Sequence, residues 1–182
     1  MNGAQAHLLL NHLPVFGVVF GLIILFYAIF RKSEEMKRVA LGLFVLTALS
    51  TIPAYLTGEP AEELVEEMAE VSHQLIEDHE ESALASLIAV EALGALSLLG
   101  LVLSRKRNAT APALLVNATV LLALAALTMV ARTAHLGAQI HHPEIRSGFQ
   151  MEGQHEGEGE AADAAEDRIG EEEHGEHEED ED

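Results

Sequence analysis

Residues 9–30, LLNHLPVFGVVFGLIILFYAIF, form an apolar run that contains no Asp, Glu, Lys or Arg. A helix needs about 20 apolar residues to cross the hydrocarbon core of a bilayer, which is roughly 30 Å thick. Three further runs of similar length follow, at residues 39–57, 83–104 and 112–131. The sequence therefore predicts an all-α membrane protein, a four-transmembrane-helix bundle whose surroundings are the lipid bilayer.

Basic residues are concentrated in two short connections between these runs. Seven of the ten Lys and Arg residues lie there, namely Arg31, Lys32, Lys37, Arg38, Arg105, Lys106 and Arg107. Short loops rich in Lys and Arg stay in the cytoplasm. We therefore expect a multi-pass protein of the bacterial inner (cytoplasmic) membrane with both termini outside. Residues 1–5 lack the basic region of a signal peptide, so we expect the first run to be retained.

The end of the chain has a different composition. Residues 151–182 carry sixteen Asp and Glu against the single Arg168, and they hold most of the formal charge of −20. Such a segment cannot bury enough apolar surface to offset its ordering entropy. We predict two parts, a transmembrane domain at residues 1–145 and a disordered acidic tail at residues 146–182. Three histidines in the tail are candidates for loose binding of divalent metals: His155, His174 and His177.

Small residues, prolines and one amphipathic segment give the helices more detail. Gly17 and Gly21 are spaced to let another helix approach closely. Pro53 predicts a kink, Gly58 suits a helix C-cap, and Pro60 suits the first turn of the next helix. Apolar residues at helical spacing among glutamates predict an amphipathic outer helix at residues 60–71, lying as a lid over the bundle. The third spanning helix is expected to begin near residue 72 or 73.

Several function classes find no support in the sequence. The chain has no cysteine, which excludes disulfides, thiolate metal sites and covalent c-type haem attachment. It has no nucleophile elbow, no His-Glu-x-x-His motif and no phosphate-binding glycine loop. We expect no hydrolytic activity and no nucleic-acid partner.

Histidines and carboxylates gather at the predicted outer ends of the helices. At 1.5 Å of rise per residue, His12, His79 and His135 reach one layer. On the fourth helix, His135, Gln139 and His142 share one face. The candidate cofactor ligands are therefore His12, His79, His135 and His142, and the candidate metal ligands are Glu59, Glu80 and Gln139. Such clusters are typical of metal or catalytic sites, although polar filler at an interface is the competing interpretation.

Glu91 is a carboxylate deep within the third predicted span. Ionisable groups at such depth are costly and face the bundle interior. Two interpretations of Glu91 stay open: a neutral, hydrogen-bonded packing residue, or a proton relay or support for a ligand.

Four short motifs resemble those of a family of small bacterial four-helix membrane proteins catalogued as a domain of unknown function, some encoded with cytochromes. These motifs are Asn11-His12-Leu13-Pro14, Thr57-Gly58-Glu59, His79-Glu80 and Gly137-Ala138-Gln139-Ile140-His141-His142-Pro143-Glu144. The family pattern has a second glycine where this chain has Ala138. The resemblance covers about residues 7–145 and implies that His12, His79 and His142 are functional. The arrangement is also similar to that of membrane b-type cytochromes, but without their paired histidines on one helix.

Three functions remain open from the sequence. In the first, two histidines ligate one haem b near the outer face, and electrons pass between a membrane quinol and a periplasmic cytochrome-type carrier. In the second, histidines with Glu59 or Glu80 bind a Zn, Cu or Fe ion. In the third, the protein is a structural or accessory subunit without a cofactor.

Overall fold

The structure is a computed structural model that describes residues 3–66, 73–105, 112–142 and 145–146. The chain divides into two units, residues 1–142 and residues 143–182. In the second unit the description covers Ile145, in a short 3₁₀ turn, and Arg146. The predicted tail therefore lies outside the described residues, except for Arg146.

The described part of the first unit is helical throughout, with short connections. Its helices are α1 (Gly3–Leu10), α2 (His12–Phe30), α3 (Glu34–Leu56), α4 (Glu59–Glu66), α5 (His73–Leu103) and α6 (Ala113–His141). Within the described residues, four helical segments are long and apolar enough to cross a membrane: Gly3–Phe30, Glu34–Leu56, His73–Leu103 and Ala113–Ile140. The predicted four-helix membrane bundle is confirmed.

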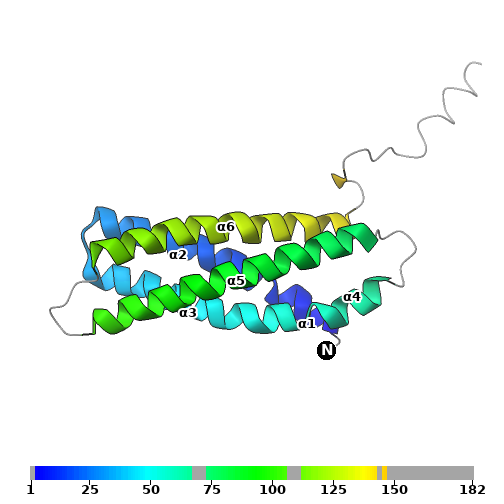
Figure 1. Cartoon of the computed structure of the whole chain (residues 1–182), viewed down its shortest axis with the longest axis horizontal. Coiled ribbons are helices and arrows are strands. Elements are labelled where there is room, and N and C mark those ends of the chain that lie inside the picture. The colour runs from blue at the N-terminus through cyan, green and yellow to red at the C-terminus, as the bar shows by residue number, and fades with distance from the viewer. Residues whose placement is uncertain (1–2, 67–72, 106–111, 143–144, 147–182) are drawn as a thin grey trace, which may run out of the picture. The chain divides into compact units, whose positions relative to one another are not determined.

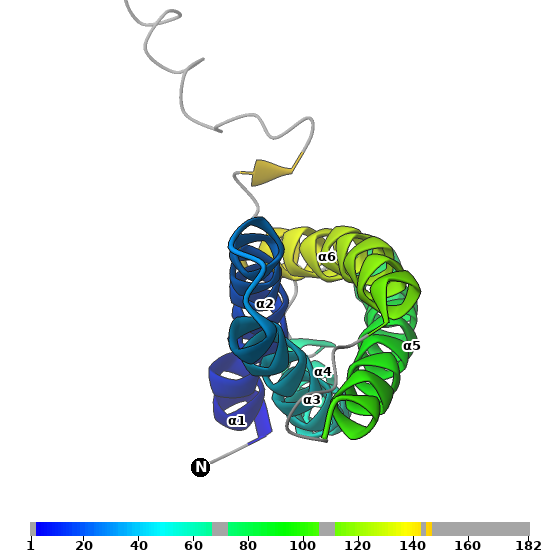
Figure 2. The same cartoon turned by 90° about the vertical axis from the view of Figure 1, so that its left-hand side faces the viewer.

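The four long helices form a closed ring, in which α2 packs on α3, α3 on α5, α5 on α6, and α6 returns to α2 (Figure 2). The interface between α2 and α6 is the smallest of these four. The short helices α1 and α4 contact each other at one end of the bundle, next to the start of α5 and the end of α6 (Figure 1). We call this the α1/α4 end. The basic residues Arg31 and Lys32 lie at the opposite end, between α2 and α3.

Glycine lets the helices of this bundle approach closely. A Cβ atom at Gly17 would overlap the side chain of Thr47, and one at Gly21 would overlap the ring of Phe44. Phe44 is fully buried. The predicted close packing at Gly17 and Gly21 is thus confirmed, and the helix that approaches there is α3.

The bundle is apolar on its outside as well as inside. Leu25, Phe44 and Leu93 are fully buried in the core, whereas Ile23 and Leu121 are more than half exposed on the helix surfaces. Exposed large apolar side chains on every long helix suit a hydrocarbon surrounding, in which burial in the core offers no hydrophobic gain.

The helix boundaries follow the local signals in most places. Ser33 caps α3, because its Oγ accepts a hydrogen bond from the backbone N of Met36 at 3.3 Å. At the other end of α3 the prediction for Gly58 was wrong: Thr57 occupies the C-cap position, and its hydroxyl donates to the carbonyl oxygens of Pro53 and Ala54, each at 2.9 Å. Gly58 follows the cap. Pro60 lies in the first turn of α4 and α5 begins at His73, as predicted.

The predicted lid is described only in its first part. Helix α4 confirms the start of the amphipathic segment, and residues 67–72 lie outside the described residues. At the end of α6, the helix stops at His141 and His142 takes the C-cap position, one residue before Pro143.

Candidate functional site

A cavity of about 470 Å³ lies at the α1/α4 end of the bundle. Four histidines line it, His7, His12, His79 and His142, and they come from α1, α2, α5 and the C-cap of α6. We call it the histidine cavity. Most of its remaining wall is apolar, with Leu8, Pro14, Val15, Phe16, Ala54, Ala83, Val130, Ala134 and Ala138 among the lining residues. Apolar walls with a few convergent polar groups are typical of ligand-binding sites, and the volume falls within their usual range of about 300–1,000 Å³.

Three of these histidines make the same kind of hydrogen bond. Nδ1 of His7 lies 3.0 Å from the carbonyl oxygen of Ala54, and Nδ1 of His79 lies 3.0 Å from that of Thr133. Nδ1 of His12 lies 3.1 Å from the carbonyl oxygen of Leu8. A carbonyl oxygen can only accept, so Nδ1 is the donor, and in the neutral ring the lone pair is then on Nε2. Metal-ligating histidines are commonly oriented by such a bond.

His79 is positioned by α6 as well as by its own helix. A Cβ atom at Gly137 would come within 2.9 Å of Cε1 of His79, so the ring occupies space that only glycine leaves open. The residue that accepts from His79, Thr133, is also fixed on its other side, because its Oγ1 lies 2.8 Å from the hydroxyls of both Ser82 and Ser86. This polar cluster joins α5 to α6, and two of its members, Ser86 and Thr133, line the histidine cavity.

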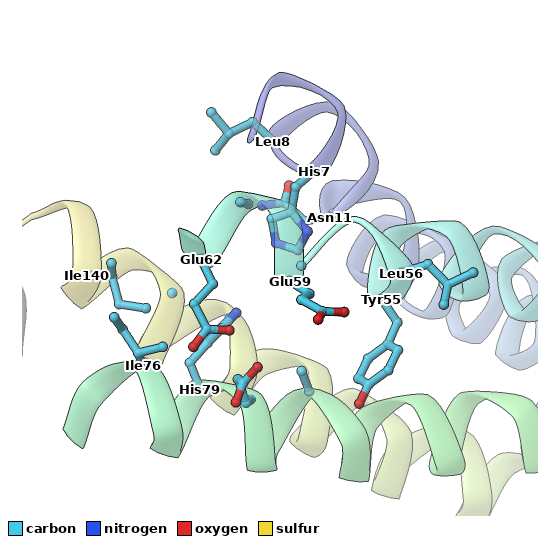
Figure 3. A pocket seen from close by; sticks show the side chains of 15 residues that line it. His7, Leu8, Asn11, Tyr55, Leu56, Glu59, Glu62, Ile76, His79 and Ile140 are labelled. Carbon is cyan, nitrogen blue, oxygen red and sulfur yellow. The ribbon is translucent and has the colours of Figure 1, made fainter. Parts of the chain in front are cut away.

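A second cavity, of about 520 Å³, adjoins the first at the same end of the bundle. Its lining includes His7, Asn11 and His79, which also line the histidine cavity, so these residues lie between the two spaces or along their shared edge. It differs by three carboxylates that the first lacks, those of Glu59, Glu62 and Glu80. We call it the acidic cavity. Figure 3 shows His7 from α1 and His79 from α5 reaching into it from opposite sides, together with Glu59 and Glu62 of α4.

The structure divides the residues singled out from the sequence into two groups. It brings His12, His79 and His142 to the histidine cavity, and Glu59, Glu80 and His79 to the acidic cavity. His135 and Gln139 line neither of these two cavities. Their side chains lie 2.7 Å apart, Nε2 to Nε2, with His135 exposed.

The polar residues of α6, the fourth spanning helix, therefore do not all line the same cavity. Its exposed edge carries His135, while Gly137, Ala138 and His142 contribute to the cavities. Within the described residues, no group of three or more His, Asp or Glu side chains is arranged to hold a metal ion.

His7 is the site residue that the sequence analysis missed, because it precedes the first apolar run. Its spacing of four residues from Asn11, one helical turn, was the available signal. Asn11 itself is notable, because its Oδ1 is buried and has no hydrogen-bond partner within the part of the chain that the structure describes. Glu91 lines neither cavity, and its Oε1 is likewise buried without a partner among the described residues.

Comparison with known proteins adds no family to this description. No protein-family model, no curated protein and no solved structure matches the chain. The resemblance drawn from the four short motifs thus stays a prediction, and the function has to be argued from the site.

Proposed function

We propose that this chain is a multi-pass protein of the bacterial cytoplasmic membrane that holds one b-type haem at its outer face. In this proposal it passes electrons between a membrane quinol and a periplasmic carrier. The observation that carries the proposal is the shared tautomer of the histidines that line one apolar cavity. His7 and His79 each donate Nδ1–H to a backbone carbonyl, which leaves Nε2 as the basic nitrogen that an iron centre requires.

The imidazoles, the apolar wall and the volume of the histidine cavity suit a haem, whereas the lack of described basic residues in its lining restricts where the haem carboxylates could lie. Imidazole nitrogens come from separate helices, the wall is apolar, and the volume is that of a cofactor site. Among the described residues, no Lys or Arg that could neutralise haem carboxylates lines either cavity. The carboxylates of a bound haem would therefore need to be solvated by water at the mouth of the histidine cavity, away from the side chains of Glu59, Glu62 and Glu80.

We assign His7 and His79 as the residues that would hold the haem, because both are partly buried and both line the histidine cavity. When bound, the haem would supply one-electron transfer. The carbonyls of Ala54 and Thr133 orient the two rings, and Ser82 and Ser86 hold Thr133 in place. The remaining protein contribution is the apolar wall, which limits access of water to the ligands.

The outward orientation rests on the distribution of charge. The described basic residues of the two short connections, Arg31, Lys32 and Arg105, lie at the end of the bundle opposite α1 and α4, and the positive-inside rule assigns that end to the cytoplasm. The α1/α4 end, with both cavities, then faces the periplasm, where a soluble carrier can reach it.

A second candidate function is binding of a divalent metal ion at the acidic cavity. The observation that favours it is the lining itself, in which Glu59, Glu62 and Glu80 accompany His7 and His79. Imidazole with carboxylate is a donor set that suits Zn, Cu or Fe ions. The described side chains are not gathered into such a set, so ion binding would need them to turn toward one another.

One preparation separates these functions. The full-length protein, purified in mild detergent, should show a reduced-minus-oxidised α-band and about one iron per chain. A stoichiometric metal without that band would instead support the ion site. A sample with neither would leave a structural or accessory role.

Alanine variants then test the ligands. His79→Ala and His7→Ala should each lose the α-band, because one of the two imidazoles that would hold the haem is removed. His135→Ala is the matched control on α6, since this exposed ring lines neither cavity, and it should retain the haem. His12→Ala and His142→Ala test the wider set predicted from the sequence: loss of the band in either, with His7→Ala unaffected, would transfer the ligand role and contradict our assignment.

A further inference from the structure

The exposed face of α6 changes from apolar to polar toward the α1/α4 end of the bundle. Exposed residues recur along this helix at spacings of three and four, which places them on one face: Leu114, Asn117, Leu121, Leu124, Thr128, Arg132 and His135. We call this set the α6 stripe. Leu121 and Leu124 make its middle apolar, which suits a hydrocarbon surrounding, whereas its last three members are polar. The stripe therefore passes from the hydrocarbon core into the head-group region near Arg132.

Arg132 departs from the distribution of basic residues in this bundle. The other described Lys and Arg residues of the first unit lie at the opposite end, around the connection between α2 and α3 and just after α5. Arg132 instead lies within the apolar segment Ala113–Ile140, and it has no ion-pair partner among the described residues. A charged group on the lipid-facing side of a span is costly unless its long side chain reaches the interface. An exposed guanidinium at this depth therefore calls for an anion at the membrane surface.

His135 supplies a second donor beside this guanidinium. Nε2 of Gln139 lies 2.7 Å from Nε2 of His135. The amide nitrogen of Gln139 only donates, so Nε2 of His135 accepts and Nδ1 carries the proton of the neutral ring. Gln139 thus positions His135 with Nδ1–H as its donor.

The two donors are close enough to serve one anion. Residues three apart on a helix have Cβ atoms about 5–6 Å apart, so Arg132 and His135 are neighbours on the stripe. Arginine matches the oxygens of a phosphate with two parallel N–H donors. One positive charge with one neutral donor also complements the single negative charge of a phosphodiester.

We propose that Arg132 and His135 bind the phosphate of a phospholipid whose acyl chains lie along Leu121 and Leu124 of the α6 stripe. This site is separate from the proposed haem, because Arg132, His135 and Gln139 line neither cavity. The assignment of the lipid to the outer leaflet rests on the orientation proposed above, and the binding itself does not.

The experiment uses a local reporter, which is feasible because the chain contains no tryptophan. Thr128→Trp places an indole on the stripe one turn from Arg132, where bromine on the acyl chains of a bound lipid quenches its fluorescence. The full-length variant is reconstituted in vesicles of digalactosyl diacylglycerol, a lipid without phosphate. Part of the lipid is replaced by brominated phosphatidylglycerol or, in a parallel series, by brominated digalactosyl diacylglycerol. We expect the site to prefer the phospholipid about fivefold, which corresponds to roughly 1 kcal/mol.

A reporter on another helix shows whether this preference is local. Ile52→Trp lies on α3, across the ring from α6 (Figure 2), and Ile52 is also exposed. Gly94 of α5 packs on Ala48 of α3, and Ser86 of α5 bonds Thr133 of α6, so the two reporters lie at about the same depth. The α3 reporter should show no preference between the two lipids.

Variants at the two donors test the site itself in the Thr128→Trp background. Arg132→Gln should abolish the preference, Arg132→Lys should retain part of it because the charge remains, and His135→Leu should reduce it less than Arg132→Gln does. Equal quenching by the two lipids, a preference that survives Arg132→Gln, or the same preference at the α3 reporter would overturn the inference. Loss of the preference on addition of inorganic phosphate would show a site for soluble phosphate and would also overturn it.

Discussion

His79 is held by two helices at once. Helix α5 carries it, while α6 supplies both the carbonyl of Thr133 that fixes its ring and the Gly137 position against which the ring lies. At the residue scale, the site thus depends on orientation as much as on the presence of imidazole, because an unrestrained ring would offer either nitrogen.

The substitution Gly137→Ala tests this dependence. The new methyl group would lie about 2.9 Å from Cε1 of His79, so the ring must move and its 3.0 Å contact with Thr133 must weaken. We expect cofactor affinity to fall roughly tenfold, as for other changes that disturb ligand orientation. Titration of the purified variant with haem, followed by absorbance, measures the effect.

Gly42→Ala provides the control for that variant. A Cβ atom at Gly42 meets nothing within 4 Å, so haem affinity should not change, and the helix should gain about 0.5–1 kcal/mol. A loss of affinity equal to that of Gly137→Ala would show that the effect is not local to His79.

At the element scale, glycine positions determine which helices of the bundle pack closely. Gly17 and Gly21 place α2 against Thr47 and Phe44 of α3, whereas the interface of α2 with α6 is smaller and residues of both helices line the histidine cavity. The close packing of α2 on α3 thus follows from the position of these two glycines on the side of α2 that faces α3.

The variant Gly21→Ala should destabilise the bundle. The added methyl group overlaps the fully buried ring of Phe44, and overpacking of this kind costs about 1–3 kcal/mol. A lower midpoint of thermal unfolding in detergent, monitored by circular dichroism, is the expected result. Leu46→Ala is a suitable comparison, because Leu46 is 64% exposed and its loss should matter little; equal midpoints for the two variants would argue against close packing at Gly21.

At the scale of the whole molecule, basic residues of the short connections and the two cavities lie at opposite ends of the bundle. Of the basic residues in the short connections, the described Arg31, Lys32 and Arg105 lie at one end, and the two cavities lie at the other.

Cysteine labelling tests the orientation of the bundle in the membrane. The experiment is simple because the chain contains no native cysteine. The exposed positions Glu35 and Glu77 lie near opposite ends of the bundle. In intact spheroplasts, a membrane-impermeant maleimide should label Glu77→Cys, and it should label Glu35→Cys only after permeabilisation. The reverse pattern would place the cavities on the cytoplasmic side.

Removal of the acidic tail is a further test at this scale. Truncation after Met151 should preserve expression and any bound cofactor, because residues 151–182 have no apolar periodicity with which to dock. The capacity for loosely held divalent metal should fall, since His155, His174 and His177 are removed with the carboxylates. Iron analysis and the α-band of the truncated protein measure retention of the cofactor, and equilibrium dialysis against Zn²⁺ measures the capacity for loosely held metal. Disappearance of the band would mean that the tail contributes ligands.

The sequence by itself determined the membrane class, the number of spanning helices and most of their boundaries. It could do so because hydrocarbon thickness fixes run length, and because Pro and Ser act on the backbone within one turn. It also indicated that His12, His79 and His135 lie toward one end of the bundle, since the rise per residue is constant along a helix.

Only the tertiary structure decided which of the candidates meet. Rotation of a helix about its axis is set by packing against its neighbours, and no local pattern encodes it. The rotation of α6 leaves His135 exposed while Gly137 lies under the ring of His79, and the fold of α1 onto α3 brings His7, outside the apolar runs, into the site. The hydrogen bonds that orient the two imidazole rings likewise depend on carbonyls distant in sequence, Ala54 for His7 and Thr133 for His79, which only the folded chain brings within 3.0 Å.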